Sequence, residues 1–152
     1  IFVMTSRNTI KVEVVDSEKQ IFSGDVEYLV APGSEGEIGI FPSHVPLISK
    51  LKPGVLRLQL PDEQTQAIFA ISGGFMEVRR DQVIVLADIA ERTDELDEAR
   101  LIEQKTLALD KIKRTGADGS SPADVAKAHA ALEIAIAQLK AVDYIKKHKN
   151  RA

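Results

Sequence analysis

Residues 31–47 read Ala-Pro-Gly-Ser-Glu-Gly-Glu-Ile-Gly-Ile-Phe-Pro-Ser-His-Val-Pro-Leu. The glycines of this stretch recur at every third position, and three prolines lie among and after them. Proline lacks a backbone donor and glycine weakens a strand, so we expect no helix interior and no central strand to occupy much of it. The stretch is therefore predicted to be a loop with a defined conformation.

Glycines at this spacing also raise the question of a phosphate-binding loop. The dinucleotide fingerprint has a different glycine spacing and opens a helix, which Pro42 and Pro46 prevent here. The phosphate-loop motif fails as well, because no Gly-Lys-Ser or Gly-Lys-Thr follows. We therefore do not expect a nucleotide to bind at residues 31–47.

On both sides of this stretch, from residue 9 to about residue 90, the apolar pattern has a period of two. Residues 10–14 alternate as in a strand with one wet face, and residues 56–60 and 65–71 form a predicted hairpin around Pro61. Residues 83–87 are uniformly apolar and predict a strand buried on both faces. Further short strands are expected at residues 20–22, 26–31, 37–40 and 75–78. Eight or more short strands without intervening helices predict a sandwich or barrel.

From residue 94 onward the period becomes helical. One helix is predicted over residues 94–114, and a second from Pro122 to about Lys147, after a turn rich in glycine and serine. Ser121 provides an N-cap, Pro122 suits the first helical position, and Asp124 complements the helix dipole. The fold class is therefore α+β in two parts: an antiparallel β-sandwich or barrel at residues 1–91 and an antiparallel helical hairpin at residues 92–152.

The second helix has an apolar face made mostly of alanine. Alanine favours helix formation, but its burial yields little free energy because the hydrophobic gain scales with area. Such a hairpin would form readily and bind a surface weakly, which suits an element that can leave one docking site for another. A hairpin packed permanently on the sandwich is the equally weighted alternative.

Composition excludes several classes of protein. The chain has 152 residues, 44% of them hydrophobic and 28% charged, as expected for an ordinary globular protein that does not span a membrane. It has no cysteine, so it has no disulfide, thiolate metal site or cysteine nucleophile. Its net charge of −3 argues against nucleic-acid binding.

The sequence shows no pattern typical of a catalytic or metal site. His44, His129 and His148 have no metal-ligand spacing, and no Gly-x-Ser-x-Gly elbow is present. The acids at residues 94–98 are ordinary charges for a helix start. We therefore predict no catalytic residue and no metal, and a binding or regulatory module rather than an enzyme.

The chain closely resembles the epsilon subunits of bacterial F-type ATP synthases. The resemblance covers residues 8 to about 147 and is strongest in the motifs at residues 22–24, 33–40, 52–54, 72–78, 85–88 and 96–100, with Pro42, His44, Pro46 and Leu47. It implies a central-stalk subunit that turns with the gamma subunit and the membrane ring of c subunits. The Leu-Asp-Glu-Ala-Arg segment at residues 96–100 favours a bacterial form over the mitochondrial chains named delta.

The resemblance also implies roles for individual residues. His44 would face gamma, and Glu37 would approach the polar loops of the c subunits, with Glu35, Ile40 and Pro46 on the same surface. An ordinary solvated Glu37 and a His44 satisfied by nearby backbone are the alternatives. The protein would lie peripherally on the cytoplasmic face of the bacterial inner membrane. Residues 1–3, ahead of Met4, are expected not to be native.

In this family the helical hairpin folds against the sandwich or extends along gamma into the alpha/beta catalytic hexamer, where it blocks hydrolysis. The basic C-terminal end would then contact the hexamer, unless it is merely solvated. This end comprises Lys146, Lys147, Lys149 and Arg151.

Some relatives bind ATP on the folded hairpin. Leu96, Asp97 and Arg100 match their motif, but Leu101 replaces its alanine and no cation stands near Ile134 or Gln138. We expect weak or no ATP binding and no required cofactor. A stand-alone nucleotide-sensing module and a small hydrolase on a β-sandwich are the less favoured functions.

Overall fold

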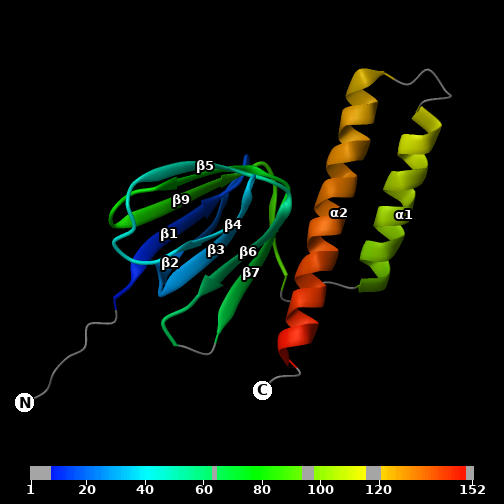
Figure 1. The fold of residues 1–152 in the computed structure, drawn as a ribbon. Helices are drawn as coiled ribbons and strands as arrows, with labels where there is room; N and C mark the ends of the chain where they lie inside the picture. The colour runs from blue at the N-terminus through cyan, green and yellow to red at the C-terminus, as the bar shows by residue number, and fades with distance from the viewer. Residues whose placement is uncertain (1–7, 63–64, 94–97, 116–120, 150–152) are drawn as a thin grey trace, which may run out of the picture.

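The computed structural model describes residues 8–62, 65–93, 98–115 and 121–149 of the chain. Ten strands come first and two helices follow (Figure 1). The strands are β1 (Ile10–Val15), β2 (Gln20–Val26), β3 (Tyr28–Gly33), β4 (Gly36–Ile40), β5 (Leu47–Leu51), β6 (Gly54–Gln59), β7 (Gln66–Ile71), β8 (Gly74–Val78), β9 (Gln82–Ala87) and β10 (Ala90–Arg92). The helices are α1 (Glu98–Thr115) and α2 (Pro122–Lys149). The predicted order of strands and helices is confirmed, and residues 94–97 at the predicted start of the first helix lie outside the description.

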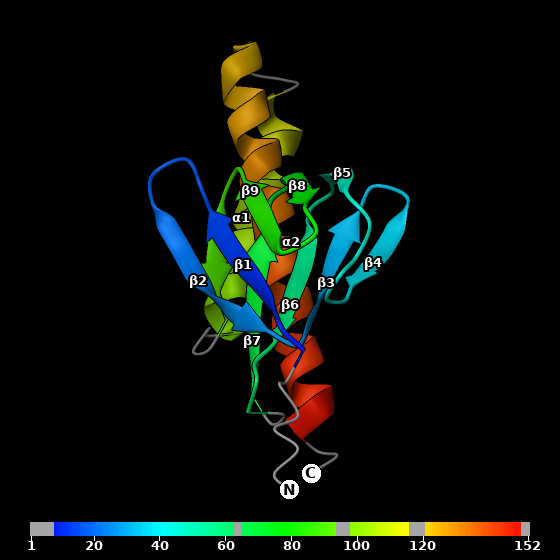
Figure 2. The same cartoon turned by 90° about the vertical axis from the view of Figure 1, so that its left-hand side faces the viewer.

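The strands form one sheet that folds back on itself. Its order is β10-β7-β6-β3-β5-β8-β9-β1-β2, and β4 pairs with β3 off this path (Figure 2). The two ends of the order approach each other, because the rings of Phe22 on β2 and Phe69 on β7 meet edge to face at 6.1 Å. All pairs are antiparallel except β1 with β9, which is parallel. The predicted sandwich or barrel is confirmed, with this one parallel pair as a difference.

The core lies inside this folded sheet and is built from alternate residues of its strands. Ile10, Val12 and Val14 of β1 are fully or almost fully buried, as their alternation predicts. Phe69 of β7 is the largest fully buried side chain. The core cluster around it contains residues of the strands and none from the described parts of the helices.

The prediction of a loop over residues 31–47 is wrong for residues 31–33, which belong to β3, whereas the strand predicted at residues 37–40 is confirmed as β4. Strand β3 runs through Pro32 to Gly33, and β4 pairs with it in a hairpin. Pro32 is tolerated because it lies where β3 passes from β6 to β5, and its carbonyl still accepts a hydrogen bond from Lys52 N at 2.9 Å. The segment after Ile40 is irregular, as predicted.

The prediction that residues 83–87 are buried on both faces is also wrong. Val83 and Val85 are fully buried, but Leu86 is 51% exposed. Strand β9 lies between β8 and β1, so its backbone is fully paired while its outer face remains open. A central strand whose backbone is paired on both sides therefore still presents apolar side chains to the surroundings.

The sheet extends slightly beyond the predicted boundary between residues 91 and 92. Strand β10 pairs with β7, and both the backbone N and the Oγ1 of Thr93 donate to the carbonyl of Ile68, at 2.9 and 3.1 Å. Thr93 is 2% exposed. Among the residues described between β10 and α1, Thr93 is thus bonded to the sheet.

The two helices lie on one side of the sandwich. Helix α2 lies between the sheet and α1, and its first half extends beyond the sheet (Figure 1). Its C-terminal half packs on β6 and β7, whereas α1 packs mainly on α2. The two buried residues of α1, Leu101 and Ala108, are consistent with this narrow contact. The predicted antiparallel hairpin is thus held to the sandwich through α2.

Candidate functional site

The outer face of β5, β8 and β9 carries an unusual group of exposed apolar side chains. Ile48 is 74% exposed, Phe75 53% and Leu86 51%. The strand register places Phe75 directly opposite Leu86 and Ile48 diagonal to Phe75, so the three share one face. We call these three residues the apolar face. Exposed apolar side chains gathered on one face of a sheet are typical of a surface that contacts another molecule.

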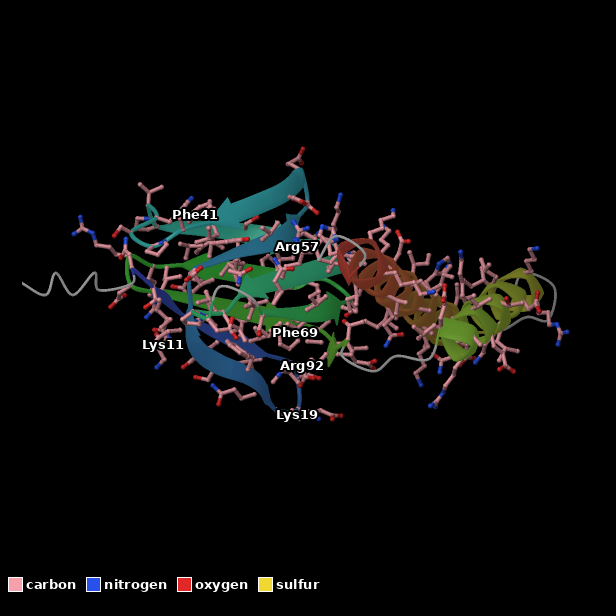
Figure 3. All side chains as sticks on the ribbon, turned by 90° about the horizontal axis from the view of Figure 1, so that it is seen from below. Lys11, Lys19, Phe41, Arg57, Phe69 and Arg92 are labelled. Carbon is pink, nitrogen blue, oxygen red and sulfur yellow. The ribbon has the colours of Figure 1, made fainter. Side chains whose placement is uncertain are left out.

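Segment 41–46 contains an exposed apolar side chain, Phe41, and two of the predicted contact residues, His44 and Pro46. Phe41 is 59% exposed, stacks on Tyr28 at 5.3 Å, and lies at the end of the sandwich away from the helices (Figure 3). Ser43 has a φ of 64°, which bends the chain so that His44 N donates to Phe41 O at 3.2 Å. His44 is half-buried with its Nδ1 2.7 Å from Val45 O, and Pro46 is exposed.

The β3–β4 hairpin carries the other predicted contact residues. Glu35 is exposed in the turn, and Glu37 on β4 is 66% exposed. Glu37 keeps this exposure while it pairs with Arg57, whose Nη2 lies 3.3 Å from its Oε2. Ile40 is 0% exposed in the core, because the alternation along β4 turns it inward. Its side chain therefore cannot contact a partner at the surface, and we withdraw it from the proposed contact set.

Helix α2 docks on the outer face of β6 and β7 through small side chains. Ala137 and Ala141 are 1% and 0% exposed, and they pack against Ile68 and Ala70 of β7. Ile134, Tyr144 and Ile145 border this cluster. The two alanines themselves contribute little buried area, and the larger side chains of Ile134, Tyr144 and Ile145 add to the contact.

Polar contacts complete the docking near the end of α2. Tyr144 donates from its hydroxyl to Gln66 Oε1 at 3.1 Å, and its ring centroid lies 4.6 Å from Arg57 Cζ. The ring also stacks on His148 at 4.0 Å. Earlier in α2, Gln138 Nε2 donates to the Glu91 carboxylate. Docking of α2 thus depends on polar groups of three strands, β6, β7 and β10.

The basic end of α2 is already engaged within the chain. Lys146 pairs with Glu98 at the start of α1, and Lys147 pairs with Asp143 at 2.8 Å. The Lys149 side chain and the whole of Arg151 lie outside the described part of the chain. In this conformation Lys146 ties the two helices together, so a contact with another subunit would have to replace its pair with Glu98.

A cavity of about 680 Å³ lies between α1 and α2. The structure brings Arg100 into it together with Ile134 and Gln138. Leu96 and Asp97, the other predicted ligand residues, lie outside the described residues. The sequence analysis missed two further cations in the lining, Lys111 and Lys127; the antiparallel pairing of the helices is the signal that could have found them.

The charges of this cavity are divided between its ends. Arg100 and Lys111 are eleven residues apart on one helix, which is about 16 Å along the axis. Arg100 shares one end with Glu91, a carboxylate that repels phosphate. A cavity with apolar walls and separated cations can accept an amphiphilic anion. Its cations, however, do not converge on one phosphate group, as a tight phosphate site requires.

Within residues 8–62, 65–93, 98–115 and 121–149, no group of three or more His, Asp or Glu side chains is placed to hold a metal ion. Neither α1 nor α2 has a stretch long and apolar enough to cross a membrane.

The sequence analysis also missed the apolar face. Leu86 belongs to a uniformly apolar run, and Phe75 to a short strand of mixed composition, so neither residue stands out in the sequence as exposed. The register that groups them with Ile48 comes from pairings between strands distant in sequence. It is therefore visible only in the fold.

Comparison with known proteins relates the whole chain to one family. A profile described as ATP synthase, Delta/Epsilon chain, beta-sandwich domain matches residues 9–93. The ATP synthase epsilon chain of Chromobacterium violaceum is 53% identical over 137 residues, which cover 90% of this chain and 95% of the relative. That of Laribacter hongkongensis is 47% identical, covering 92% of this chain and 97% of the relative.

A solved structure shares the fold. A chain in the structure of the Euglena gracilis mitochondrial ATP synthase, OSCP/F1/c-ring, superposes with a TM-score of 0.67 at 23% identity. The match covers 84% of this chain and 78% of that one. With the profile over the sandwich and bacterial relatives along nearly its whole length, the chain belongs to the family of ATP synthase epsilon chains, subunits of an enzyme complex.

Proposed function

We propose that this chain is a non-catalytic rotor subunit of the proton-translocating F-type ATP synthase, where it joins the gamma subunit to the c ring in the central stalk. The observation that carries the proposal is the apolar face of Ile48, Phe75 and Leu86, exposed on a chain of this family. A rotor joint must transmit torque without sliding, and such a joint needs a large apolar contact with a polar rim.

The apolar face and segment 41–46 fit the gamma side of this joint. His44 and Pro46 follow Phe41 in that segment, so the residue implied to face gamma is continuous with exposed apolar side chains. Glu35 and Glu37 lie on the separate β3–β4 hairpin and fit the polar loops of the c subunits. The complex then holds the chain peripherally at the cytoplasmic face of the bacterial inner membrane.

A charge placed in the apolar face tests the joint. Phe75→Glu should weaken binding of the full chain to gamma by at least tenfold, because it buries a carboxylate in an apolar contact. Calorimetry or surface plasmon resonance with purified gamma measures this affinity. Ser23→Glu adds the same charge at an exposed position of β2 and should leave the affinity unchanged. Equal affinities for the Phe75→Glu variant and the original chain would contradict the proposed gamma surface.

The hairpin supplies the regulatory part of the proposed function. In its docked state, α2 is held by small apolar side chains and a few polar contacts, which other contacts can replace. Released helices would extend along gamma into the alpha/beta hexamer and oppose ATP hydrolysis. Lys146, Lys147, Lys149 and Arg151 would then meet acidic surface of the hexamer. The alanines at the centre of the docked face, whose burial yields little free energy, support this role.

ATP is proposed as a weak regulatory ligand of the docked hairpin, in the cavity lined by Arg100, Lys111 and Lys127. Because these cations are divided between the two ends of the cavity, we expect a dissociation constant well above the micromolar range. Titration calorimetry on the isolated protein measures it, with Lys127→Ala compared against Lys113→Ala on the outside of α1. Micromolar binding would favour the alternative function, a nucleotide-sensing module.

A further inference from the structure

Arg57 contacts two parts of the molecule that are distant in sequence. It lies on β6, at the side of the sandwich that faces the helices (Figure 3). Its Nη2 is 3.3 Å from Glu37 Oε2 on β4, and its Cζ is 4.6 Å from the centroid of the Tyr144 ring on α2. One guanidinium therefore joins the β3–β4 hairpin to the docked helix.

The two contacts support each other physically. Arg57 is mostly buried, with 21% of its side chain exposed, so its guanidinium has few alternative positions and little water around it. The Glu37 carboxylate holds the guanidinium at the ring, and the ring covers the guanidinium, which strengthens its attraction to the carboxylate. If Glu37 pairs with another cation, Arg57 regains rotamer freedom and its contact with Tyr144 weakens.

Glu37 is accessible to such a cation. Its side chain is 66% exposed, and it borders a groove of about 330 Å³ that Tyr144 also borders. Arg57 itself is shielded beneath the helix, so a partner can reach the carboxylate without displacing α2 first.

We propose that Arg57 couples occupancy of Glu37 to docking of α2, so that a cationic group bound at the β4 edge favours release of the helix. The coupling is reciprocal: a docked α2 lowers the affinity of Glu37 for a cation, and a released α2 raises it. This inference rests on the proposed function, because it assigns regulation of the hairpin to the surface that faces the rotor.

The coupling is measured on the isolated full chain. Amide hydrogen exchange of α2 around Ala141, followed by NMR, gives the opening constant of the docked helix. Glu37→Gln removes the charge that holds Arg57 and should raise this constant about two- to fourfold. Arg57→Met removes the guanidinium and keeps an apolar stem, and should raise it about three- to tenfold. Glu35→Gln, two residues away in the exposed turn, is the matched control and should have no effect.

Combined variants separate the coupling from a general charge effect. Tyr144→Phe keeps the ring face and loses the bond to Gln66, so Glu37→Gln should still raise the opening constant in this background. Tyr144→Leu removes the ring, and there, as with Arg57→Met, Glu37→Gln should have no further effect. The proposal is overturned if Glu37→Gln leaves the opening constant unchanged in the original chain. It is equally overturned if the change persists in the Tyr144→Leu or Arg57→Met background, or if Glu35→Gln produces it too.

These results do not depend on whether the hairpin inhibits hydrolysis. Inhibition is tested by removal of the hairpin from the assembled complex, whereas the exchange measurements follow α2 in the isolated chain. A failed coupling with an intact hydrolysis effect would remove this inference and leave the proposed function in place.

Discussion

At the scale of single residues, the turn between β7 and β8 depends on a glycine that no other residue can replace. Gly74 has a φ of 136°, and a Cβ at this position would lie 2.0 Å from the carbonyl oxygen of Leu86. The neighbouring strand β9 approaches the backbone here because no side chain separates them. The apolar face depends on this approach, since Phe75 and Leu86 pair one residue farther on.

Gly74→Ala should therefore destabilise the protein severely, by at least about 3 kcal/mol, from the backbone strain and the clash together. Gly36→Ala is a close control, because Gly36 has the same φ of 136° but nothing within 4 Å of the added Cβ. It should cost only the strain, about 1–2 kcal/mol. Urea unfolding followed by circular dichroism measures both free energies. Equal losses would show that the close approach at Gly74 contributes nothing.

At the scale of elements, the face of α2 that docks on the sheet needs small side chains where the two pack closely. Ala141 is fully buried against β7, whereas Ala130 is exposed in the half of the helix beyond the sheet. Overfilling a packed contact is destabilising, and the same change on an exposed helix surface is not.

Ala141→Leu should consequently raise the opening constant of the docked α2 by about fivefold or more, since overpacking costs about 1–3 kcal/mol. Ala130→Leu adds the same atoms without a neighbour and should leave the constant unchanged. Hydrogen exchange of α2 measures this effect too. An unchanged constant for Ala141→Leu would mean that the contact with β7 is loose enough to absorb three more carbons.

Element boundaries and periods were largely predictable from the sequence, because alternation and helix caps are local properties. The hairpin of β6 and β7 and the start of α2 at Pro122 follow the predicted ranges. The path of β3 through Pro32 was not predictable from the sequence. It depends on the change of pairing partner along β3, which pairs with β6 at residues 28–30 and with β5 at Gly33. The inward position of Ile40 follows from the same hairpin.

The candidate site was less predictable than the fold. Glu37 could be selected from its motif, but its pairing with Arg57 joins residues twenty positions apart, and Tyr144 lies farther still. The apolar face likewise needs the register of β5, β8 and β9. Long-range pairing decides these contacts, and a single sequence carries no direct record of it.

At the scale of the whole molecule, the core of the sandwich includes no residue from the described parts of the helices. The main core consists of strand residues, and the second, smaller cluster lies between α2 and β7. The sandwich should therefore keep its fold without the helices, with a newly exposed docking strip around Val55, Ile68 and Ala70.

Removal of residues 94–152, which leaves Thr93 and its bonds to Ile68 intact, should raise ATP hydrolysis by the reconstituted complex severalfold while assembly is retained. Hydrolysis assays on complexes with and without the hairpin measure this, and gel filtration checks assembly. Unchanged hydrolysis in an assembled complex would contradict an inhibitory hairpin.

The overhang of α2 has a mechanical consequence. With 28 residues the helix is about 42 Å long, and the apolar cluster that packs it on the sheet begins at Ile134. About 18 Å of helix thus projects beyond Ile134, and about 17 Å continues from there to Ile145. The helix therefore has two segments of nearly equal length, one that projects beyond the sandwich and one that is docked on it, and it can pivot at the edge of the sandwich between them. A sideways force on the N-terminal end of α2 is therefore transmitted along the helix to Tyr144 with little loss. A molecule that contacts only this end of α2 can thus separate the docked end from the sheet.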